Sequence, residues 1–256
     1  MVKKIKGLLI FIPALFAVGC SQKSSEEAEQ PKPNILWITA EDIGPALGCY
    51  GDPQARTPNL DELASDGVVY TNAYANAPIC APARSSIITG MHATSLGTPH
   101  LRSEIPVPDK IKGIPEYLDQ LGYFSTNSGK TDYNFSPAGM WDQNGTDSAH
   151  WQYRPDGDPF FSVFNYGVTH EGHVNSYQAE DYKNLKKRHD PDEINLPPYF
   201  PDTPKMRELW ARQYDLITVL DKRVGELIDQ LKKDGLYDET IIFFYGDHGF
   251  GLPRYK

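Results

Sequence analysis

Three short apolar segments, each followed directly by polar residues, constrain the fold of this chain most. They read NILWIT at 34–39, FFSVFN at 160–165 and TIIFFY at 240–245. Unbroken apolar runs of this length are typical of parallel strands that are buried on both faces. The carboxyl ends of parallel strands meet at one edge of a sheet, where open α/β sheets bind ligands. The sequence therefore predicts an α/β fold with a mostly parallel central sheet flanked by helices.

The residues that follow these segments carry chemistry. Glu41 and Asp42 follow the first segment, His170 follows the second, and Asp247 and His248 follow the third. Adjacent carboxylates at a buried edge are costly unless a cation compensates them, and carboxylate and imidazole are ligands of divalent metals. Two other interpretations stay open at this point, because acid pairs are common at helix N-termini and a histidine after a strand is often structural.

A compact motif, CAPAR at 80–84, precedes a run that ends at Gly90. Proline suits the first turn of a helix and glycine its end, so we expect a helix that starts just after Cys80. The N-terminus of a helix favours an anion, and Arg84 lies one turn further on, pointing toward the same spot. The alternative is a buried cysteine in an ordinary capping loop.

The motif at 80–84, the Glu41–Asp42 pair and the segment RTPNL at 56–60 occur in an order and spacing that resemble the type I sulfatases of the alkaline-phosphatase-like superfamily. The resemblance implies an alkaline-phosphatase-like sandwich. It also implies that a maturating, formylglycine-generating enzyme oxidises Cys80 to formylglycine, which then attacks a sulfate ester. The function implied is a sulfuric ester hydrolase acting on a sulfated carbohydrate.

The same resemblance assigns roles to single residues. The expected cofactor is Ca²⁺, with Mn²⁺ as the alternative because His248 suits it better. The implied metal ligands are Glu41, Asp42, the group made from Cys80, Asp247 and His248. Arg84 would hold the hydrated formylglycine, and Lys130 and His170 would bind sulfate, with Lys256 as a further substrate-binding lysine.

The chain departs from the family pattern at two positions. Asp132 stands where the family usually has a histidine that contacts sulfate, and Glu41 replaces the usual first aspartate. His100 and Arg102 follow the motif helix and are candidates for contact with the sugar or with a neighbouring sulfate; a purely structural loop is the alternative there.

The N-terminus has the features of an exported lipoprotein. Three lysines precede an apolar run that is too short to cross a bilayer, and small residues precede Cys20. We expect a lipoprotein signal at 1–19, lipidation of Cys20, a flexible tether over 20–33, and a membrane anchor at the cell envelope. A plain secretory signal is the alternative. Loss of 1–19 removes three lysines and no acids, so the formal charge of −9 becomes −12, which argues against a nucleic-acid partner.

Other patterns predict helices over 57–67, 114–121 and 206–231, strands over 68–74 and 123–127, and a long surface excursion over 171–203. The resemblance covers 34–256 and matches only the N-terminal part of a sulfatase catalytic domain, so we expect a fold that is incomplete at the C-terminus. Cys49 is expected to be a buried free cysteine, since a bond to Cys80 would exclude the sulfatase chemistry.

Two further functions remain open. One is a phosphodiesterase or phosphonate monoester hydrolase of the same superfamily, favoured by the Asp247–His248 pair and by the histidine lost at Asp132. The other is a catalytically inactive glycan-binding protein of the cell surface.

Overall fold

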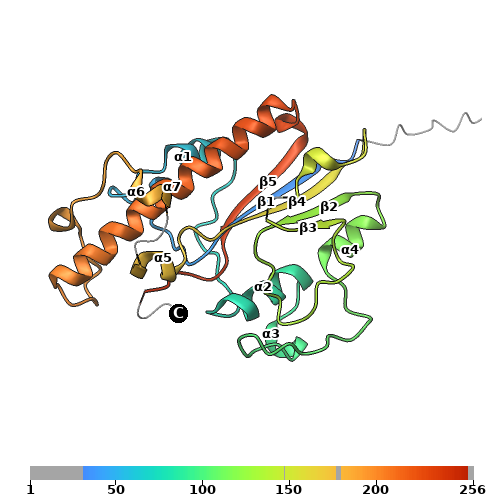
Figure 1. The fold of residues 1–256 in the computed structure, drawn as a ribbon, viewed down its shortest axis with the longest axis horizontal. Coiled ribbons are helices and arrows are strands. Elements are labelled where there is room, and N and C mark those ends of the chain that lie inside the picture. The colour runs from blue at the N-terminus through green and yellow to red at the C-terminus, as the bar shows by residue number, and fades with distance from the viewer. Residues whose placement is uncertain (1–30, 147, 177–179, 253–256) are drawn as a thin grey trace, which may run out of the picture. The chain divides into compact units, whose positions relative to one another are not determined.

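The computed structural model describes residues 31–146, 148–176 and 180–252, and within them a five-stranded sheet of order β3-β2-β4-β1-β5 (Figure 1). Every strand pair is parallel, which confirms the parallel α/β prediction. The strands are β1 (Asn34–Ala40), β2 (Phe124–Ser128), β3 (Gln143–Asn144), β4 (Phe160–Tyr166) and β5 (Thr240–Gly246). Only the two-residue strand β3 has no counterpart in the sequence prediction.

The register brings three strand ends to one level. Ala40 at the end of β1 pairs with Tyr166 of β4 and with Gly246 of β5. Two backbone hydrogen bonds extend the pairing by one residue, from Glu41 N to Tyr166 O at 3.0 Å and from Asp247 N to Ala40 O at 3.1 Å. The polar residues after these strands therefore start from the same edge of the sheet.

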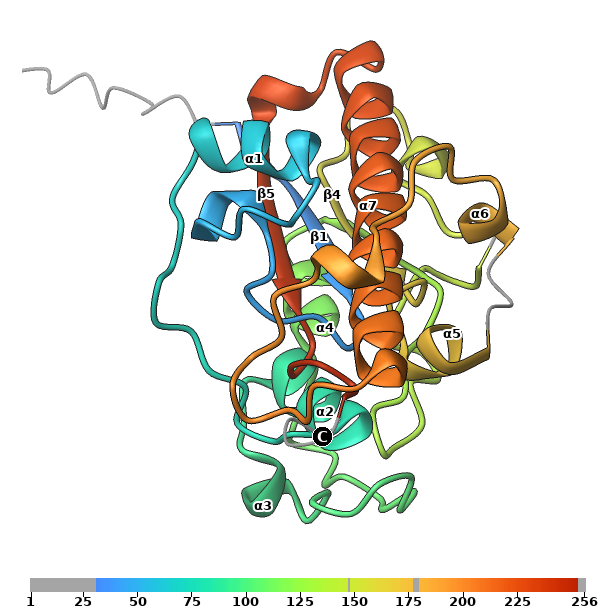
Figure 2. The same ribbon diagram turned by 90° about the vertical axis from the view of Figure 1, so that its left-hand side faces the viewer.

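Helices cover both faces of the sheet (Figures 1 and 2). The long helix α7 (Pro204–Lys233) packs against the face that carries Leu36 and Ile38. These two side chains are fully buried there, as are Leu216, Leu220 and Leu231 of α7. On the other face, α4 (Ile114–Asp119) packs near Trp37 and Phe161. The helical spacing of leucines over 206–231 thus serves core packing, as the sequence predicts.

The motif segment forms α2 (Cys80–Thr89), followed by α3 (Ala93–Leu96). Gly90 ends α2 with φ of 68°, a left-handed conformation that glycine adopts without steric cost. The helix begins at Cys80 itself, so this cysteine lies in the first turn rather than just ahead of it. Cys80 therefore still lies at the N-terminal end of the helix, where an anion is favoured.

Two expectations about strands are wrong. Residues 68–74 form no strand, and Val68 and Tyr74 are 80% and 88% exposed, because this segment runs over the surface without a pairing partner among the described residues. Strand β5 is an edge strand rather than a fully buried one. Ile241 and Phe243 remain about half exposed on the face away from α7, since only β1 flanks β5 within the described residues.

The described parts of 171–203, which are 171–176 and 180–203, contain more helix than the expected excursion. They form α5 (Glu171–Ser176) and α6 (Glu180–Lys183), and both helices contact α7. Short 3₁₀ turns complete the described chain at Gly48–Tyr50, Trp151–Tyr153, Pro191–Glu193 and Tyr237–Glu239. Among the described helices, none combines the length and the apolar character needed to cross a membrane. The predicted signal, Cys20 and Lys256 lie outside the described residues.

Helix α1 (Pro58–Ser65) is capped from another helix. The hydroxyl of its N-cap Thr57 bonds elsewhere, accepting from Gly48 N and donating to Asp61. Instead, the buried carboxylate of Asp221 on α7 accepts from Leu60 N at 2.8 Å and from Asn59 Nδ2 at 2.7 Å. A negative charge at a helix N-terminus is favourable, so this contact fixes α1 against α7.

The first prediction concerns this capping contact. Asp221→Asn should lower the free energy of unfolding by about 1–3 kcal/mol, because the new amide group faces donors and the charge at the helix N-terminus is lost. The measurement is urea unfolding followed by circular dichroism. Asp229→Asn on the exposed side of the same helix is the matched control and should change little; equal effects of the two substitutions would contradict the role given to Asp221.

Candidate active site

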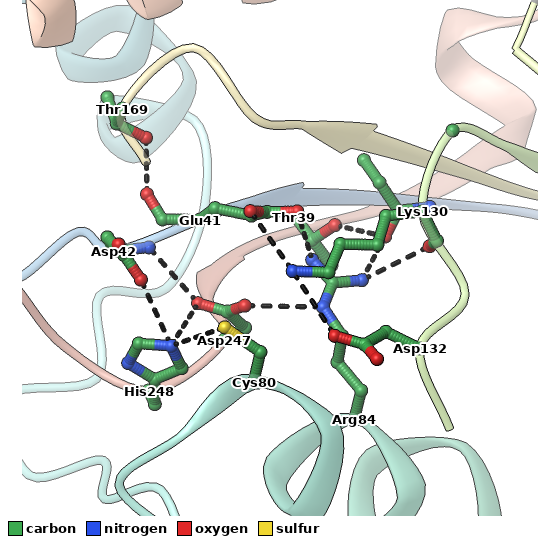
Figure 3. A network of polar contacts seen from close by, with 12 residues as sticks. Thr39, Glu41, Asp42, Cys80, Arg84, Lys130, Asp132, Thr169, Asp247 and His248 are labelled. Carbon is green, nitrogen blue, oxygen red and sulfur yellow. Dashed lines mark hydrogen bonds and ion pairs between the residues drawn. The ribbon is translucent and has the colours of Figure 1, made fainter. Parts of the chain in front are cut away.

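Six of the residues singled out from the sequence meet at the carboxyl edge of the sheet (Figure 3). Glu41 and Asp42 follow β1, Asp247 and His248 follow β5, and Cys80 and Arg84 come from the first turns of α2. These side chains are nearly or fully buried, with Asp42, Asp247 and Arg84 exposing 0%, 1% and 4% of their surface. Buried charges of this kind need close partners, and the contacts below supply them.

The guanidinium of Arg84 joins several strand ends. Its Nε donates to Asp247 Oδ2 at 3.2 Å, and its Nη1 donates to Asn165 Oδ1 at 2.8 Å and to Lys130 O at 3.3 Å. Its Nη2 lies 3.5 Å from Glu41 Oε1. Arg84 therefore contacts residues that follow or end β1, β2, β4 and β5, and the planar guanidinium suits such a multiple contact.

The ring of His248 lies close to three other candidate metal ligands. Its Nε2 lies 3.1 Å from Asp42 Oδ1, 3.5 Å from Asp247 Oδ1 and 3.3 Å from Cys80 Sγ. Asp42, Cys80 and His248 can each offer a ligand atom within 4.8 Å of one another. Carboxylate oxygens, an imidazole nitrogen and a group at position 80 form a donor set that fits one divalent cation, so four of the five implied ligands come together.

Glu41, the fifth implied ligand, points elsewhere in this structure. Its Oε2 is 3.3 Å from Lys130 Nζ, and its Oε1 faces Arg84. Two cations therefore hold the carboxylate apart from the group around His248. The replacement of the usual aspartate by the longer glutamate gives the side chain the reach for these contacts.

His170 lies beside the same edge. Its Nδ1 accepts from Gly172 N at 3.1 Å, and it forms a second group of possible metal ligands with Asp42 and Glu171. Asp42 Oδ2 accepts from Glu171 N at 2.8 Å, which ties the residues after β4 to those after β1. The structure thus brings His170 next to Asp42, as its place in the sequence suggests.

Lys130 is present at the site, and Asp132 changes its surroundings. Lys130 Nζ lies between Glu41 Oε2 and Asp132 Oδ2, the latter at 3.4 Å, and Arg102 contacts the same Asp132 oxygen at 3.2 Å. His100 is exposed, and its carbonyl accepts from Asn134. Arg102 is thus joined to the site through Asp132, whereas no contact of the described residues joins the His100 ring to it.

Sequence reasoning missed the residues that support these groups. Asn165 accepts from Arg84 and from the Thr39 hydroxyl, the latter at 2.6 Å. The Thr169 hydroxyl donates to the backbone carbonyl of Glu41. The sequence signal that could have identified Asn165 and Thr39 is a polar residue near the end of an apolar strand. Such a residue lies at the ligand-binding edge of the sheet.

The two cysteines of the described residues, Cys49 and Cys80, are both free. Burial alone would raise the pKa of the Cys80 thiol, but the hydrogen bond with His248 and the charge of Lys130 bring it below its usual value. Burial likewise opposes the charged form of His248, yet its bonds to Asp42 and Cys80 raise its pKa to about 9. The contact between Cys80 and His248 therefore favours the charged form of both groups.

Comparison with known proteins supports the resemblance to sulfatases that the sequence shows. The model of the family described as Sulfatase matches residues 33–132 and 124–255. An ulvan-active sulfatase of Formosa agariphila is 37% identical over 92% of this chain and 46% of its own length. Human N-acetylgalactosamine-6-sulfatase is 28% identical over 88% of this chain and 51% of its own length. The chain thus spans about half the length of the curated relatives it matches.

Solved structures show the same fold. A 2-O GAG sulfatase superposes with a TM-score of 0.67 at 18% identity, covering 88% of this chain and 60% of that structure. A phosphonate monoester hydrolase of Agrobacterium radiobacter gives 0.69 at 18% identity, covering 85% and 63%. These matches confirm the alkaline-phosphatase-like α/β fold that the sequence predicts.

The second prediction compares the thiols of Cys80 and Cys49 in the unconverted, chelator-treated chain. Alkylation of Cys80 should persist to lower pH than that of an ordinary thiol, because His248 and Lys130 favour its thiolate. Cys49 should need higher pH, because burial and the charge of Asp61 raise its pKa. Mass spectrometry of the two peptides over a pH series measures both. His248→Gln should move the Cys80 midpoint upward and leave Cys49 unchanged; coincident midpoints for both cysteines would refute the interpretation.

Proposed function

Because this chain belongs to the sulfatase family, we propose that the protein containing it hydrolyses sulfate esters through a formylglycine made from Cys80. The observation that carries the proposal is the meeting of Cys80, Arg84, Asp247 and His248 at one buried point at the strand ends. Cys80 opens a helix, and a helix N-terminus favours the anionic sulfate.

In the proposed reaction the aldehyde at position 80 is hydrated to a geminal diol. One hydroxyl oxygen attacks the sulfur, the bond from sulfur to the ester oxygen breaks, and the alcohol leaves with a proton. The second hydroxyl then loses its proton and re-forms the aldehyde, which breaks the bond to sulfate. Splitting one difficult displacement into two steps is the advantage of covalent catalysis, and a thiol could not perform the second step.

The chain's own residues have distinct tasks in this scheme. Arg84, held by Asp247 and Asn165, orients the diol from its buried position. Lys130 and His170 bind sulfate oxygens and stabilise the charge that develops there. A divalent cation held by Asp42, Asp247, His248 and the oxygen at position 80 would lower the pKa of the attacking hydroxyl and polarise the sulfate. We propose Ca²⁺, with Mn²⁺ as the alternative that the His248 nitrogen favours.

The proposed substrate is a sulfated carbohydrate. Two of the matched relatives are named ulvan-active sulfatase and N-acetylgalactosamine-6-sulfatase. The formal charge of the chain is −9, so its overall field repels a sulfated glycan. Lys130 and Arg102 supply the local positive charge that offsets this repulsion. We also propose the expected maturating enzyme as a partner, and export with lipidation at Cys20.

A phosphonate or phosphodiester hydrolase is the second candidate. The imidazole of His248 in the candidate metal group favours it, because nitrogen donors suit Mn²⁺ better than Ca²⁺. Matched sulfate and phosphate diesters assayed with Mn²⁺ and with Ca²⁺ separate the two functions.

The third prediction tests the proposed function directly. Protein expressed from the whole coding sequence together with a maturating enzyme should carry an aldehyde at position 80 and release sulfate from sulfated oligosaccharides. Mass spectrometry of the peptide and ion chromatography of sulfate are the measurements, with Cys80→Ala as the inactive control. Unconverted Cys80 with no sulfate release, or much faster turnover of the phosphate diester, would overturn the proposal.

The fourth prediction concerns Lys130. Lys130→Ala should lower kcat/KM for a sulfate ester by about 100-fold, since removal of one donor to a developing oxyanion has effects of this order. Lys130→Arg should recover part of the activity. Lys222→Ala on α7, an exposed lysine that also pairs with a carboxylate, is the control and should keep the original rate. An effect of Lys130→Ala no larger than that of the control would remove Lys130 from the sulfate site.

A further inference from the structure

One carboxylate oxygen of Asp132 holds two cations. Its Oδ2 lies 3.4 Å from Lys130 Nζ and 3.2 Å from Arg102 Nη2. The distance between Lys130 Nζ and Arg102 Nη2 therefore cannot exceed the sum of these two distances. The exposure of the side chains rises outward, from 24% for Lys130 to 59% for Arg102. A row of two cations thus leads from the buried site to solvent.

The backbone around this row is firmly held. Arg102, Asp132 and Asn134 all adopt positive φ, at 54°, 51° and 59°. Asn134 is buried, and its amide donates to Thr98 O at 2.9 Å and to His100 O at 2.7 Å, while its Oδ1 accepts from Ser103 N. Backbone conformations of this kind persist only where the surroundings impose them. Segment 98–103 is thus fixed onto the segment that follows β2.

The charges explain why Arg102 is needed there. An ionised aspartate only accepts hydrogen bonds, so Asp132 would repel a sulfate bound at Lys130 unless a cation balanced it. Arg102 supplies that cation. Within the described part of the chain Asp132 is its ion-pair partner, and its other N–H groups make no further hydrogen bond there. A guanidinium with free donors at the rim can bind a second anion.

We propose that Asp132 is a positioning residue that holds Arg102 beside Lys130, so that the site prefers a sulfate ester whose sugar, or its neighbour, carries a second anionic group. This inference rests on the proposed function and narrows its substrate class. The second group is a carboxylate or another sulfate, and both would bind the guanidinium of Arg102.

The experiment measures binding preference in Cys80→Ala protein by isothermal titration calorimetry. One pair of probes is D-glucosamine 2-N,6-O-disulfate against N-acetyl-D-glucosamine 6-O-sulfate, whose nitrogen carries no charge. The other is glucuronic acid 2-sulfate against glucose 2-sulfate, so the two pairs distinguish a sulfate from a carboxylate. At least one dianionic probe should bind about five- to tenfold more tightly than its partner.

Substitutions at the two residues should abolish this preference. Arg102→Ala should bring the ratio near one, and Arg102→Lys should keep part of it. Asp132→Asn should also reduce the ratio without weakening the singly charged probe, because it removes a repelling charge while releasing Arg102. A merely structural role of Asp132 would weaken both probes alike. Lys222→Ala, the matched control, should preserve the ratio.

Three results decide the inference. Equal binding of both members in both pairs, or a preference that survives Arg102→Ala in a protein that unfolds normally by circular dichroism, overturns it. A preference lost on Arg102→Ala and on Asp132→Asn supports it. If the preference is present while the matured protein releases no sulfate from any probe, the role of Asp132 stands and only the hydrolase proposal falls.

Discussion

The site depends on one buried guanidinium. Arg84 is 4% exposed and contacts Asp247, Asn165, Glu41 and the carbonyl of Lys130, which belong to or follow four different strands. Loss of one member of a buried ion pair is strongly unfavourable, because the remaining charge stays without compensation. The same contacts hold the start of α2 at the strand ends, because Arg84 and Cys80 belong to the same helix. Arg84 therefore determines both the position of Cys80 and the charge balance of the sheet edge.

The acids at this edge need more positive charge than Arg84 provides. Glu41 has Lys130 as a second cation, whereas Asp42 and Asp247 face the ring of His248. Against the effect of burial, the hydrogen bonds to Asp42 and Cys80 and then the charge of Asp247 raise the pKa of His248 to about 9. A proton on His248 and a divalent cation are therefore alternative ways to balance the same pair of acids. The charges of this edge favour a cation beside Asp42 and Asp247, and this preference does not depend on any likeness to other proteins.

Much of this arrangement could be predicted from the sequence because it rests on local patterns. The apolar runs defined β1, β4 and β5, and the residues after them defined the ligand edge. The predictions failed where the outcome depended on distant partners. Residues 68–74 alternate like a strand but have no neighbouring strand in the described part of the chain. The sequence of β5 is typical of a buried strand, although among the described strands it lies at an edge. The contacts of Glu41 with two cations, and the cap that Asp221 provides for α1, join segments far apart in sequence.

Asp132 stands where the sulfatase pattern has a histidine, and neighbouring cations balance its negative charge. A histidine at this position could donate a hydrogen bond to sulfate, whereas an ionised aspartate can only accept. The structure compensates by placing Lys130 and Arg102 on one oxygen of Asp132 and by fixing the Arg102 segment through the buried Asn134. The positive charge that faces solvent is thereby moved outward from the buried edge to the rim. A chain with a net charge of −9 attracts an anion only through such local placement, so under our proposal the identity of residue 132 decides where along an anionic substrate that attraction acts.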